Sequence, residues 1–363
     1  MCSTVGVRVM WLLPLLGVGA LLSGCSVLGV EPPRHVVTSV APSTASTASP
    51  SPNSFSSAPT PIPTTSVTPS IPVPTASTAP APQASGSLTW KPVGRLVDGS
   101  RAVQVATTDA GAIGLMWLDP TKLSFRYVPG YQFPEKSPRM AQDKQSATWL
   151  PGLTAAFNGA FHLRDNAGGY FYDGITVRPL RPGLASIVTR SDGSMQVVVW
   201  ADYMTPQPGT SAIRQNLPPL VSAGVSQATA HDGNAKWGLA NSGLPHANRS
   251  ALGETADGAL VFAYGHEVTA EAIGAALVQA GVQTAAMLDM NKSWPTGFYY
   301  DAPSSASSAA TSSPPKPVGH RIHAAIQRDP STYFSPFKKD FFVAIARDAL
   351  APTPWASPTP SLP

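Results

Sequence analysis

The segment Thr269–Asp289 reads TAEAIGAALVQAGVQTAAMLD and predicts a helix that leads directly into a buried strand. Thr269 is a suitable N-cap residue, and Glu271 lies in the first helical turn, where a negative charge interacts favourably with the free N–H groups. Gly281 stands where a helix ends. The apolar positions of the helix share one face: Ile273, Leu277 and Ala280.

Other short apolar runs predict further strands around this segment. Gln196–Trp200 follows the turn residues Ser191–Ser194, and Leu260–Tyr264 follows Asp257-Gly258. Phe341–Ile345 predicts another core strand near the end of the chain. Strands mixed with at least one clear helix are typical of an α+β domain, and we expect one domain over residues 90–350.

The rest of the chain has a different composition. The chain has 363 residues with 39 prolines, and no charged residue lies between Arg34 and Lys91. Such a Ser/Thr/Pro/Ala-rich stretch cannot bury enough apolar surface to offset the entropy of ordering, so residues 25–89 are predicted to be a disordered tether. Residues 302–317 are similar in composition and predict an inserted surface loop, and residues 351–363 a Pro/Ser-rich tail.

The first residues have the features of a targeting signal. Arg8 precedes the apolar run Val9–Leu22, which is short for a membrane span and suits a signal-peptide core. The run ends in Leu-Ser-Gly-Cys25, which resembles the lipobox of bacterial lipoproteins. That resemblance implies removal of residues 1–24, acylation of Cys25 (palmitate included) and anchoring at the outer face of the cell membrane. The alternative is an ordinary secretory signal with an incidental cysteine.

Composition excludes several classes of function. The net charge of +4 is small for this length and no run of Lys or Arg occurs, so nucleic acid is not an expected partner. Two cysteines exclude a disulfide-dense scaffold and a four-thiolate zinc site. The chain has no P-loop, no Gly-x-Ser-x-Gly elbow and no dinucleotide fingerprint. No histidine pair has a metal-ligand spacing, so we expect no cofactor, although a divalent cation stays open.

Three segments resemble the phosphodiester glycosidase family, whose type activity is that of an N-acetylglucosamine-1-phosphodiester alpha-N-acetylglucosaminidase. They are Ala155–Phe161, with Asn158-Gly159 after an apolar strand; Asn248–Gly253, followed by Asp257–Phe262; and the helix that runs into Met287–Asp289. Gly168–Tyr170, Asp173-Gly174 and Arg214–Leu217 are similar to elements of an actinobacterial branch. The resemblance spans about residues 95–347 and implies a single mixed-sheet domain of the family's type.

The chain departs from the family after Asp289. Many members have Asp-Gly-Gly-Gly-Ser at this point, whereas this chain has Asp-Met-Asn-Lys-Ser over residues 289–293. Glycines permit close backbone approach to a ligand and positive φ angles, and Met290 and Lys292 remove that freedom. The fold therefore carries over better than the substrate geometry.

The family's reaction separates a sugar from the phosphate of a sugar-1-phosphodiester. Glycosidic cleavage passes through an oxocarbenium-like state, in which carboxylates act as acid, base or nucleophile. Asp289, at the end of a buried strand, is the preferred catalytic carboxylate, with loop capping as the alternative. Arg249 is predicted to hold the phosphate, since a guanidinium grips phosphate through two N–H groups, with a structural ion pair as the alternative.

Four further residues are predicted to bind substrate: Asn158, Gly159, Asn291 and Ser293. The alternatives are a tight turn at Asn158-Gly159 and loop capping at the other two positions. Structural roles are favoured for His162, His231, His246 and His266. The second carboxylate stays open among Asp173, Asp232, Glu254 and Asp301. Four aromatic residues could stack on a sugar, although core or rim positions are commoner: Trp237, Trp294, Tyr299 and Tyr300.

Three hypotheses on function follow from these patterns. The first is an envelope-anchored hydrolase that cleaves sugar-1-phosphodiester bonds of cell-wall or glycolipid substrates. The second is a non-catalytic glycan-binding lipoprotein on the same fold, which the lost glycines favour. The third is a transferase that moves a glycosyl or phosphoglycosyl group. All three have a glycan or sugar-phosphate partner and contact the lipid bilayer through the acylated Cys25.

Overall fold

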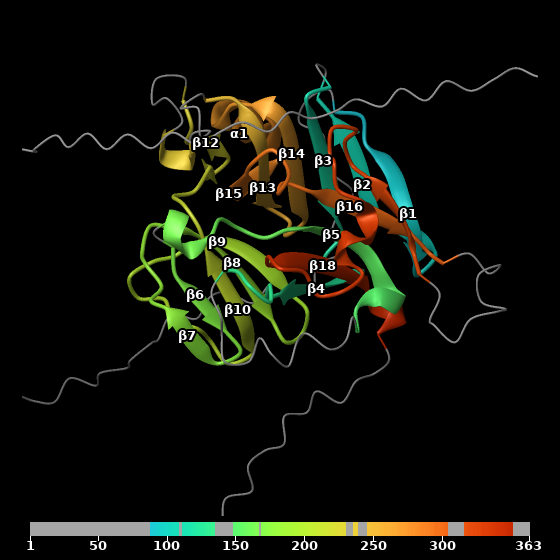
Figure 1. Ribbon diagram of the computed structural model, residues 1–363, viewed down its shortest axis with the longest axis horizontal. Helices are drawn as coiled ribbons and strands as arrows, with labels where there is room; N and C mark the ends of the chain where they lie inside the picture. The colour runs from blue at the N-terminus through green and yellow to red at the C-terminus, as the bar shows by residue number, and fades with distance from the viewer. Residues whose placement is uncertain are drawn as a thin grey trace, which may run out of the picture. The chain divides into compact units, whose positions relative to one another are not determined.

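The computed structural model describes residues 88–108, 111–134, 148–166, 168–229, 235–238, 245–303 and 316–350 (Figure 1). The predicted signal peptide, Cys25 and the tail lie outside these residues, as do the tether up to residue 87 and residues 304–315 of the predicted insertion. The described residues form three β-sheets, and every strand pair in them is antiparallel.

The first sheet, here called sheet A, has eight strands in the order β1-β2-β3-β14-β13-β15-β11-β12. Their bounds are β1 Lys91–Val97, β2 Ser100–Thr107, β3 Ile113–Leu118, β14 Leu260–Val268, β13 Ala247–Thr255, β15 Val282–Met290, β11 Val221–Ser222 and β12 Val225–Ser226. The predicted strands at Leu260–Tyr264 and in front of Asp289 are confirmed in β14 and β15.

Two five-stranded sheets complete the fold. Sheet B has the order β17-β16-β5-β18-β4 and sheet C the order β7-β6-β10-β8-β9. Sheet B consists of β17 Val318–Arg321, β16 Gly297–Asp301, β5 Leu153–Asn158, β18 Phe341–Ala346 and β4 Leu123–Val128. Sheet C consists of β7 Ile175–Arg178, β6 Tyr170–Tyr172, β10 Thr210–Gln215, β8 Ala185–Arg190 and β9 Met195–Val199. Short 3₁₀ helices cover Leu150–Gly152, Leu163–Asp165, Ala235–Trp237, Pro330–Tyr333 and Arg347–Ala349.

The predicted helix is confirmed as α1, Ala270–Gln279. The Thr269 hydroxyl accepts a hydrogen bond from the N–H of Ala272 at 3.1 Å, which satisfies one of the free donors at the helix start. Gly281 follows the helix with φ of +82°, a conformation that favours glycine. The buried helix face includes Ile273 and Leu277, which pack against the β13–β15 part of sheet A.

The prediction of an α+β fold with a single mixed sheet is wrong. The structure is mostly β, and α1 is the only α-helix within the described part of the chain. A mixed sheet, which the family resemblance implied, needs at least one parallel strand pair, and the strands on either side of α1 are β14 and β15. Both strands do run in the same direction, but β13 lies between them and pairs antiparallel with each. The helix therefore connects strands that are two positions apart, and no parallel pair forms.

The largest hydrophobic core joins all three sheets. Phe157 of sheet B stacks on Phe262 of sheet A at 4.9 Å between ring centroids, and on Phe342 of sheet B at 5.4 Å. Tyr170 and Ile187 of sheet C belong to the same buried cluster. Successive side chains on a strand point to opposite faces. The face of sheet A that turns away from this core packs instead against α1.

Within the described segments, no helix has the length and apolar character needed to cross a membrane.

Candidate functional site

Three hydrogen bonds join the three sheets at one polar junction inside the molecule. The amide Nδ2 of Asn158 (sheet B) donates to Oγ of Ser250 (sheet A) at 2.9 Å. Nε of Arg214 (sheet C) donates to Oδ2 of Asp340, the residue before β18, at 3.0 Å. Nδ2 of Asn216 donates to the carbonyl of Leu288 in β15 at 2.9 Å. Buried polar groups are hydrogen-bonded as a rule, so this junction fixes how the sheets meet.

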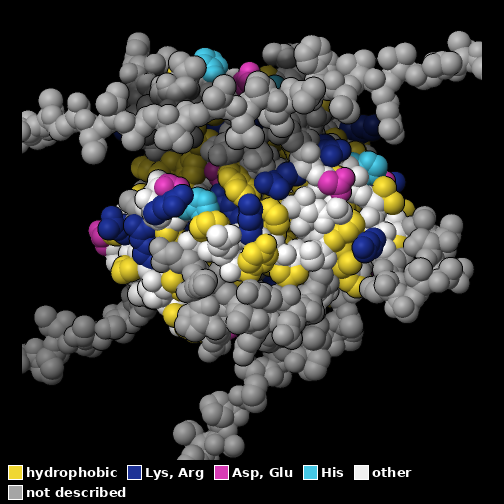
Figure 2. Space-filling model, in the orientation of Figure 1, with side chains coloured by type: hydrophobic (Ala, Val, Ile, Leu, Met, Phe, Trp, Pro, Cys, Tyr) yellow, Lys and Arg dark blue, Asp and Glu magenta, His cyan; other side chains and the backbone are white. Residues whose placement is uncertain are grey.

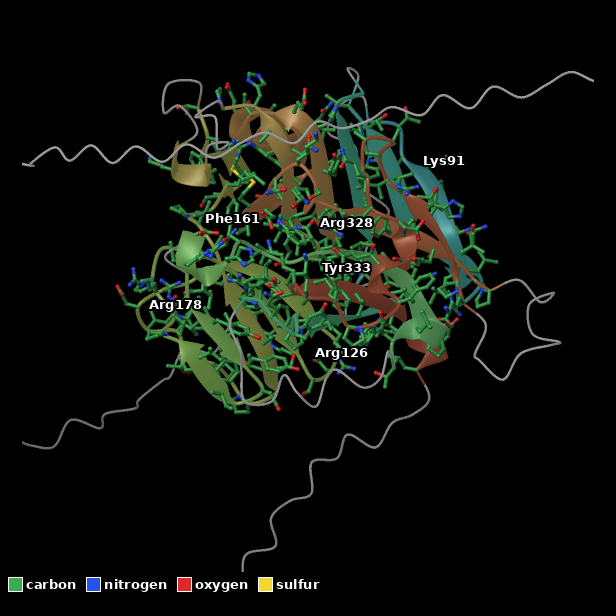
Figure 3. The ribbon with its side chains drawn as sticks, in the orientation of Figure 1. Lys91, Arg126, Phe161, Arg178, Arg328 and Tyr333 are labelled. Atoms are coloured by element: carbon green, nitrogen blue, oxygen red, sulfur yellow. The ribbon has the colours of Figure 1, made fainter. Side chains whose placement is uncertain are left out.

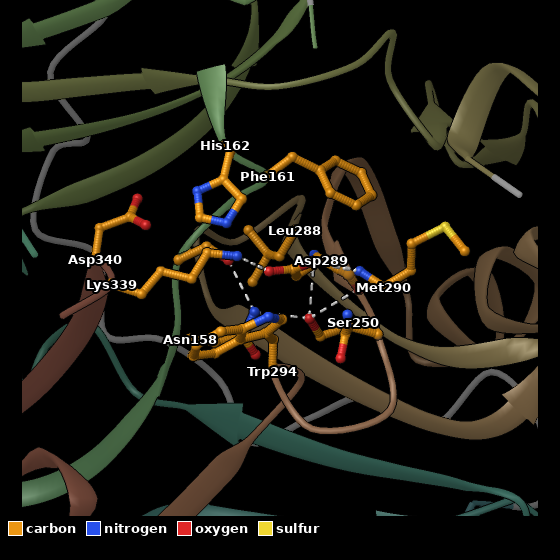
Figure 4. A network of polar contacts seen from close by, with 12 residues as sticks. Asn158, Phe161, His162, Ser250, Leu288, Asp289, Met290, Trp294, Lys339 and Asp340 are labelled. Carbon is orange, nitrogen blue, oxygen red and sulfur yellow. Dashed lines mark hydrogen bonds and ion pairs between the residues drawn. The ribbon is translucent and has the colours of Figure 1, made fainter. Parts of the chain in front are cut away.

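Asp289 lies at this junction, near the end of β15 and opposite Ser250 on β13. Its Oδ1 accepts the N–H of Met290 at 2.7 Å, and its Oδ2 accepts a hydrogen bond from Nζ of Lys339 (Figure 4). The Ser250 hydroxyl also contacts the Asp289 backbone, accepting its N–H at 3.3 Å and donating to its carbonyl at 3.4 Å. The side chains of Asp289 and Lys339 are each only 3% exposed.

The buried position of Asp289 changes its acidity. Burial raises the pKa of this carboxyl from an ordinary 3.8 to about 6, since a charged carboxylate loses its hydration in the interior. The Lys339 ammonium and the Met290 N–H act in the opposite direction and stabilise the charged form, whereas the charge of Asp340 adds to the rise. The group is therefore mostly ionised at pH 7 and takes up a proton in mildly acidic solution, as catalytic carboxyls do.

Three cations surround the ring of Trp294, which follows Asp289 in the next loop. The distances to the ring centroid are 4.7 Å for Cζ of Arg328, 4.9 Å for Nζ of Lys338 and 5.3 Å for Nζ of Lys339. Such contacts hold cations over an aromatic face. Lys339 pairs with Asp289, whereas no carboxylate of the described residues forms a salt bridge with Lys338 or Arg328.

Figure 2 shows Lys and Arg side chains gathered beside hydrophobic ones near the middle of the displayed face, and Figure 3, in the same orientation, labels Arg328 there. Nε of Arg328 donates to the carbonyl of Ser293 at 2.8 Å, which fixes the guanidinium at the loop after β15. The cations named above thus give this region an excess of positive charge that suits an anionic ligand.

A second buried ion pair involves Asp340, the residue that follows Lys339 in the chain. The side chains of Arg214 and Asp340 are fully buried and form an ion pair, and the Tyr127 hydroxyl donates to the same Asp340 oxygen at 3.2 Å. Burial, followed by the charge of Asp340, raises the pKa of Tyr127 well above its ordinary value. Burial alone would lower the pKa of Arg214, but the charge of Asp340 raises it. At neutral pH, Tyr127 is therefore a neutral donor and Arg214 a cation, and both hold Asp340 in place.

Gly159 makes room for Asp340. A Cβ at this position would lie 2.5 Å from Cγ of Asp340, closer than carbon atoms approach without displacement. The N–H of Gly159 donates to the Asp340 carbonyl at 2.9 Å. The structure thus gives Gly159 a role in packing against Asp340, and its predicted substrate contact stays a prediction.

Asn158 is almost fully buried, and its amide is occupied by the protein itself. Besides Ser250, its Nδ2 donates to the Gly159 carbonyl at 2.8 Å, and its Oδ1 accepts the N–H of Thr296 at 2.9 Å. Asn291 lies on the exposed loop after β15, where Oδ1 accepts the N–H of Ser293 at 3.1 Å. This local turn fits loop capping, the alternative given above for Asn291 and Ser293.

Arg249 points away from Asp289. Its neighbour on the strand, Ser250, faces Asn158, so Arg249 faces the other side of sheet A. The guanidinium donates to carbonyls of Val268 at 3.1 Å, Trp237 at 2.8 Å and two further residues, Gly238 and Pro245, each at 2.9 Å. Burial lowers its pKa to about 10. Because backbone carbonyls occupy the N–H groups of the guanidinium, the geometry does not favour the predicted binding of phosphate by Arg249.

The remaining candidates are spread over the molecule. Asp173 and Gly174 form the exposed turn between β6 and β7 with positive φ angles. Glu254 accepts the N–H of Val197 at 2.7 Å on the far part of β13, and burial raises its pKa to about 7. Several side chains are held by partners outside the junction: Asp301 by His320, His266 by Asn248, Trp237 by Pro218 and Tyr300 by Pro330. Asp232 and His231 lie outside the described residues.

Sequence reasoning missed Lys339, Asp340 and Arg214 as members of the site. A signal was present, because Lys338-Lys339-Asp340 places three charges directly before the apolar strand β18. Charges at that position need partners when the strand is buried. Arg214 was part of a segment noted for its family resemblance, but strand β10 gave no indication that its guanidinium would reach Asp340.

Within the residues that the structure describes, no group of three or more His, Cys, Asp or Glu side chains is arranged to hold a metal ion. The expectation that the protein has no cofactor stays a prediction.

Comparisons with known proteins find only distant likeness. No protein-family model matches the chain, and no curated protein matches its sequence. Among solved structures, the chain is similar to the catalytic domain of zebrafish N-acetylglucosamine-1-phosphodiester alpha-N-acetylglucosaminidase, auto-inhibited by its pro-peptide, with a TM-score of 0.39 and 16% identity over 72% of this chain and 88% of that one.

Two further structures have lower scores. A hypothetical protein from Synechocystis has a TM-score of 0.32 and 13% identity, covering 72% of this chain and 62% of its own. An exported protein from Burkholderia pseudomallei has a TM-score of 0.29 and 10% identity, covering 68% of this chain and 75% of its own. Scores at this level do not assign a function, so the function proposed below rests on the side chains of the junction.

Proposed function

We propose that this protein is a hydrolase that cleaves sugar-1-phosphodiester bonds, with Asp289 as its catalytic carboxylate. One observation carries the proposal: a buried carboxylate with a pKa of about 6 contacts Lys339, next to two cations without a carboxylate partner among the described residues. The carboxylate suits an oxocarbenium-like state. The cations, Lys338 and Arg328, suit the phosphate.

The charges of the site match the two halves of such a substrate. As the bond between the anomeric carbon and the phosphate oxygen breaks, positive charge develops on the sugar and negative charge on the leaving phosphate. Ionised Asp289 stabilises the former, by electrostatics or as a nucleophile. Lys338 and Arg328 stabilise the latter, so the leaving group needs no proton from an acid.

The test is sugar release by the full chain. The substrates are the 1-(methyl phosphate) diesters of glucose, galactose, mannose and N-acetylglucosamine, and released sugar is quantified by chromatography. We expect release from at least one diester and a loss of at least about 100-fold in Asp289→Asn. Asp301→Asn is the matched control, because Asp301 also pairs with a basic side chain but lies half-exposed at another sheet edge. No release from any diester, or equal release by wild type and Asp289→Asn, contradicts the proposal.

A glycan-binding protein without catalysis is the second candidate. It is favoured by the closed ion pair of Asp289 and Lys339, which satisfies the carboxylate without any substrate. On that reading, calorimetry detects binding of cell-wall fragments, Asp289→Asn leaves the affinity unchanged, and no sugar is released. Turnover that depends on Asp289 excludes this candidate.

We also propose that Cys25 is acylated and anchors the protein at the outer face of the cell membrane. The support is the order of Arg8, the apolar run Val9–Leu22 and the small residues before the cysteine. Growth with a clickable palmitate analogue should label the wild type and leave Cys25→Ala unlabelled. Equal labelling of the two proteins contradicts the proposal.

A further inference from the structure

Two buried polar atoms near the Asp289–Lys339 pair have no hydrogen-bond partner among the residues that the structure describes: Nδ1 of His162 and Oδ1 of Asp340. A buried polar atom without a partner destabilises the folded state, so each such atom in a folded protein needs an explanation. The two atoms are chemically complementary, because an imidazole nitrogen can donate and a carboxylate oxygen only accepts.

The surroundings of His162 place it at the site. It directly precedes the 3₁₀ helix Leu163–Asp165, and its ring packs edge-on against Phe133 at 4.1 Å between centroids. Figure 4 shows the ring beside the Lys339 side chain, with Asp340 to one side and Asp289 to the other. The charges that act on the ring are those of Lys339 and Asp340 across from it, and of Arg164 and Asp165 on its own turn.

Asp340 is suited to orient an imidazole. Its Oδ2 is fixed by Arg214 and Tyr127, so the carboxylate cannot turn freely, and its Oδ1 remains for one more donor. A carboxylate that accepts Nδ1–H of a histidine fixes the tautomer in which Nε2 carries a lone pair. Burial and then the Lys339 charge lower the pKa of His162 below its ordinary 6.5, which keeps the ring neutral at pH 7 and able to accept a proton.

We propose that His162, positioned by Asp340 through Nδ1, is the general base that activates the attacking water in the cleavage proposed above, on which this inference rests. Nε2 takes a proton from water as the water oxygen bonds to the anomeric carbon. The bond from that carbon to the phosphate oxygen breaks, and its electron pair stays on the phosphate. One negative charge is gained by the phosphate and one positive charge by the imidazole, so the step balances.

The experiment compares His162→Ala with the wild type on the diester that the wild type hydrolyses. Loss of a general base lowers kcat by about 100-fold or more, and we expect KM to change by less than about threefold. The acidic limb of the kcat/KM profile should change from the titration of two groups to that of Asp289 alone, and added imidazole should restore part of the rate. His320→Ala is the control, since His320 pairs with Asp301 away from the junction. An unchanged rate, or an unchanged acidic limb without imidazole rescue, overturns the proposal.

A second measurement separates this inference from the proposed function. If the wild type releases no sugar, the proposed function fails and with it the role of His162 as a base. The dyad of His162 and Asp340 is then decided by imidazole ¹⁵N spectra of the full chain. Two results together support the dyad: the wild-type His162 carries its proton on Nδ1, and the pKa of the His162 imidazole is lower in Asp340→Asn than in the wild type. The pKa falls because removing a nearby negative charge disfavours the imidazolium. A mixture of tautomers, or an unchanged pKa, contradicts it.

Discussion

The stability of the protein should depend on pH through Asp289 in a direction opposite to that of most carboxylates. Its pKa is about 6 in the folded protein, against an ordinary 3.8 for the exposed group in the unfolded chain. Each pKa unit corresponds to about 1.36 kcal/mol, so the difference is worth about 3 kcal/mol. Because the folded state binds the proton more tightly, the contribution is full below pH 3.8 and is lost as pH rises through about 6.

The variant Asp289→Asn isolates this contribution. The free energy of unfolding is measured by urea titration with tryptophan fluorescence between pH 4 and pH 7.5. The wild type should lose about 2.4 kcal/mol relative to Asp289→Asn across that range, because at pH 4 the unfolded chain is already partly ionised. Loss of the Lys339 contact shifts the free energy of unfolding of the variant by the same amount at every pH. Asp301→Asn, at an exposed ion pair, should show no such change relative to the wild type. Parallel curves for the wild type and Asp289→Asn would refute the assignment of a buried, proton-binding carboxyl.

Three further predictions concern Gly159, Arg249 and Glu254. Gly159→Ala should lower the free energy of unfolding by about 1–3 kcal/mol in urea titration and reduce sugar release, because the new Cβ displaces Asp340. Arg249→Lys should lower the free energy of unfolding by about 3 kcal/mol in the same assay, since one ammonium cannot reach all the carbonyls that the guanidinium binds. The variant should keep the wild-type KM. A raised KM would instead indicate that Arg249 binds the phosphate of the substrate. Glu254→Gln should stabilise the protein by about 3 kcal/mol at pH 8 and hardly at all at pH 4, because burial raises the pKa of Glu254 to about 7; equal effects at both pH values contradict this.

The local structure of the helix region could be predicted from sequence because its signals are local. The Thr269 cap, the apolar face of α1 and the positive φ of Gly281 each depend on a few neighbouring residues. The same signals do not say which strands lie side by side. The prediction of a mixed sheet failed because β13, which comes before both β14 and α1 in the chain, lies between β14 and β15.

Residues of the candidate site could be predicted only where they lie in a segment that resembles a family motif. Asn158 and Asp289 were predicted from family-like segments, and Ser250 joins them in the structure. Arg249 lay in a similar motif, but the period of two along a strand turns it to the other face of sheet A. Lys339 meets Asp289 across a separation of 50 residues, which only the packing of sheets A and B brings about.

The most direct test of the proposed function is the release of sugar from the four methyl phosphate diesters by the full chain and by Asp289→Asn. We predict that the wild type releases sugar from at least one diester and that the variant, although folded, is at least about 100-fold slower. A folded wild type that releases no sugar, or a variant as fast as the wild type, would contradict a catalytic role for Asp289.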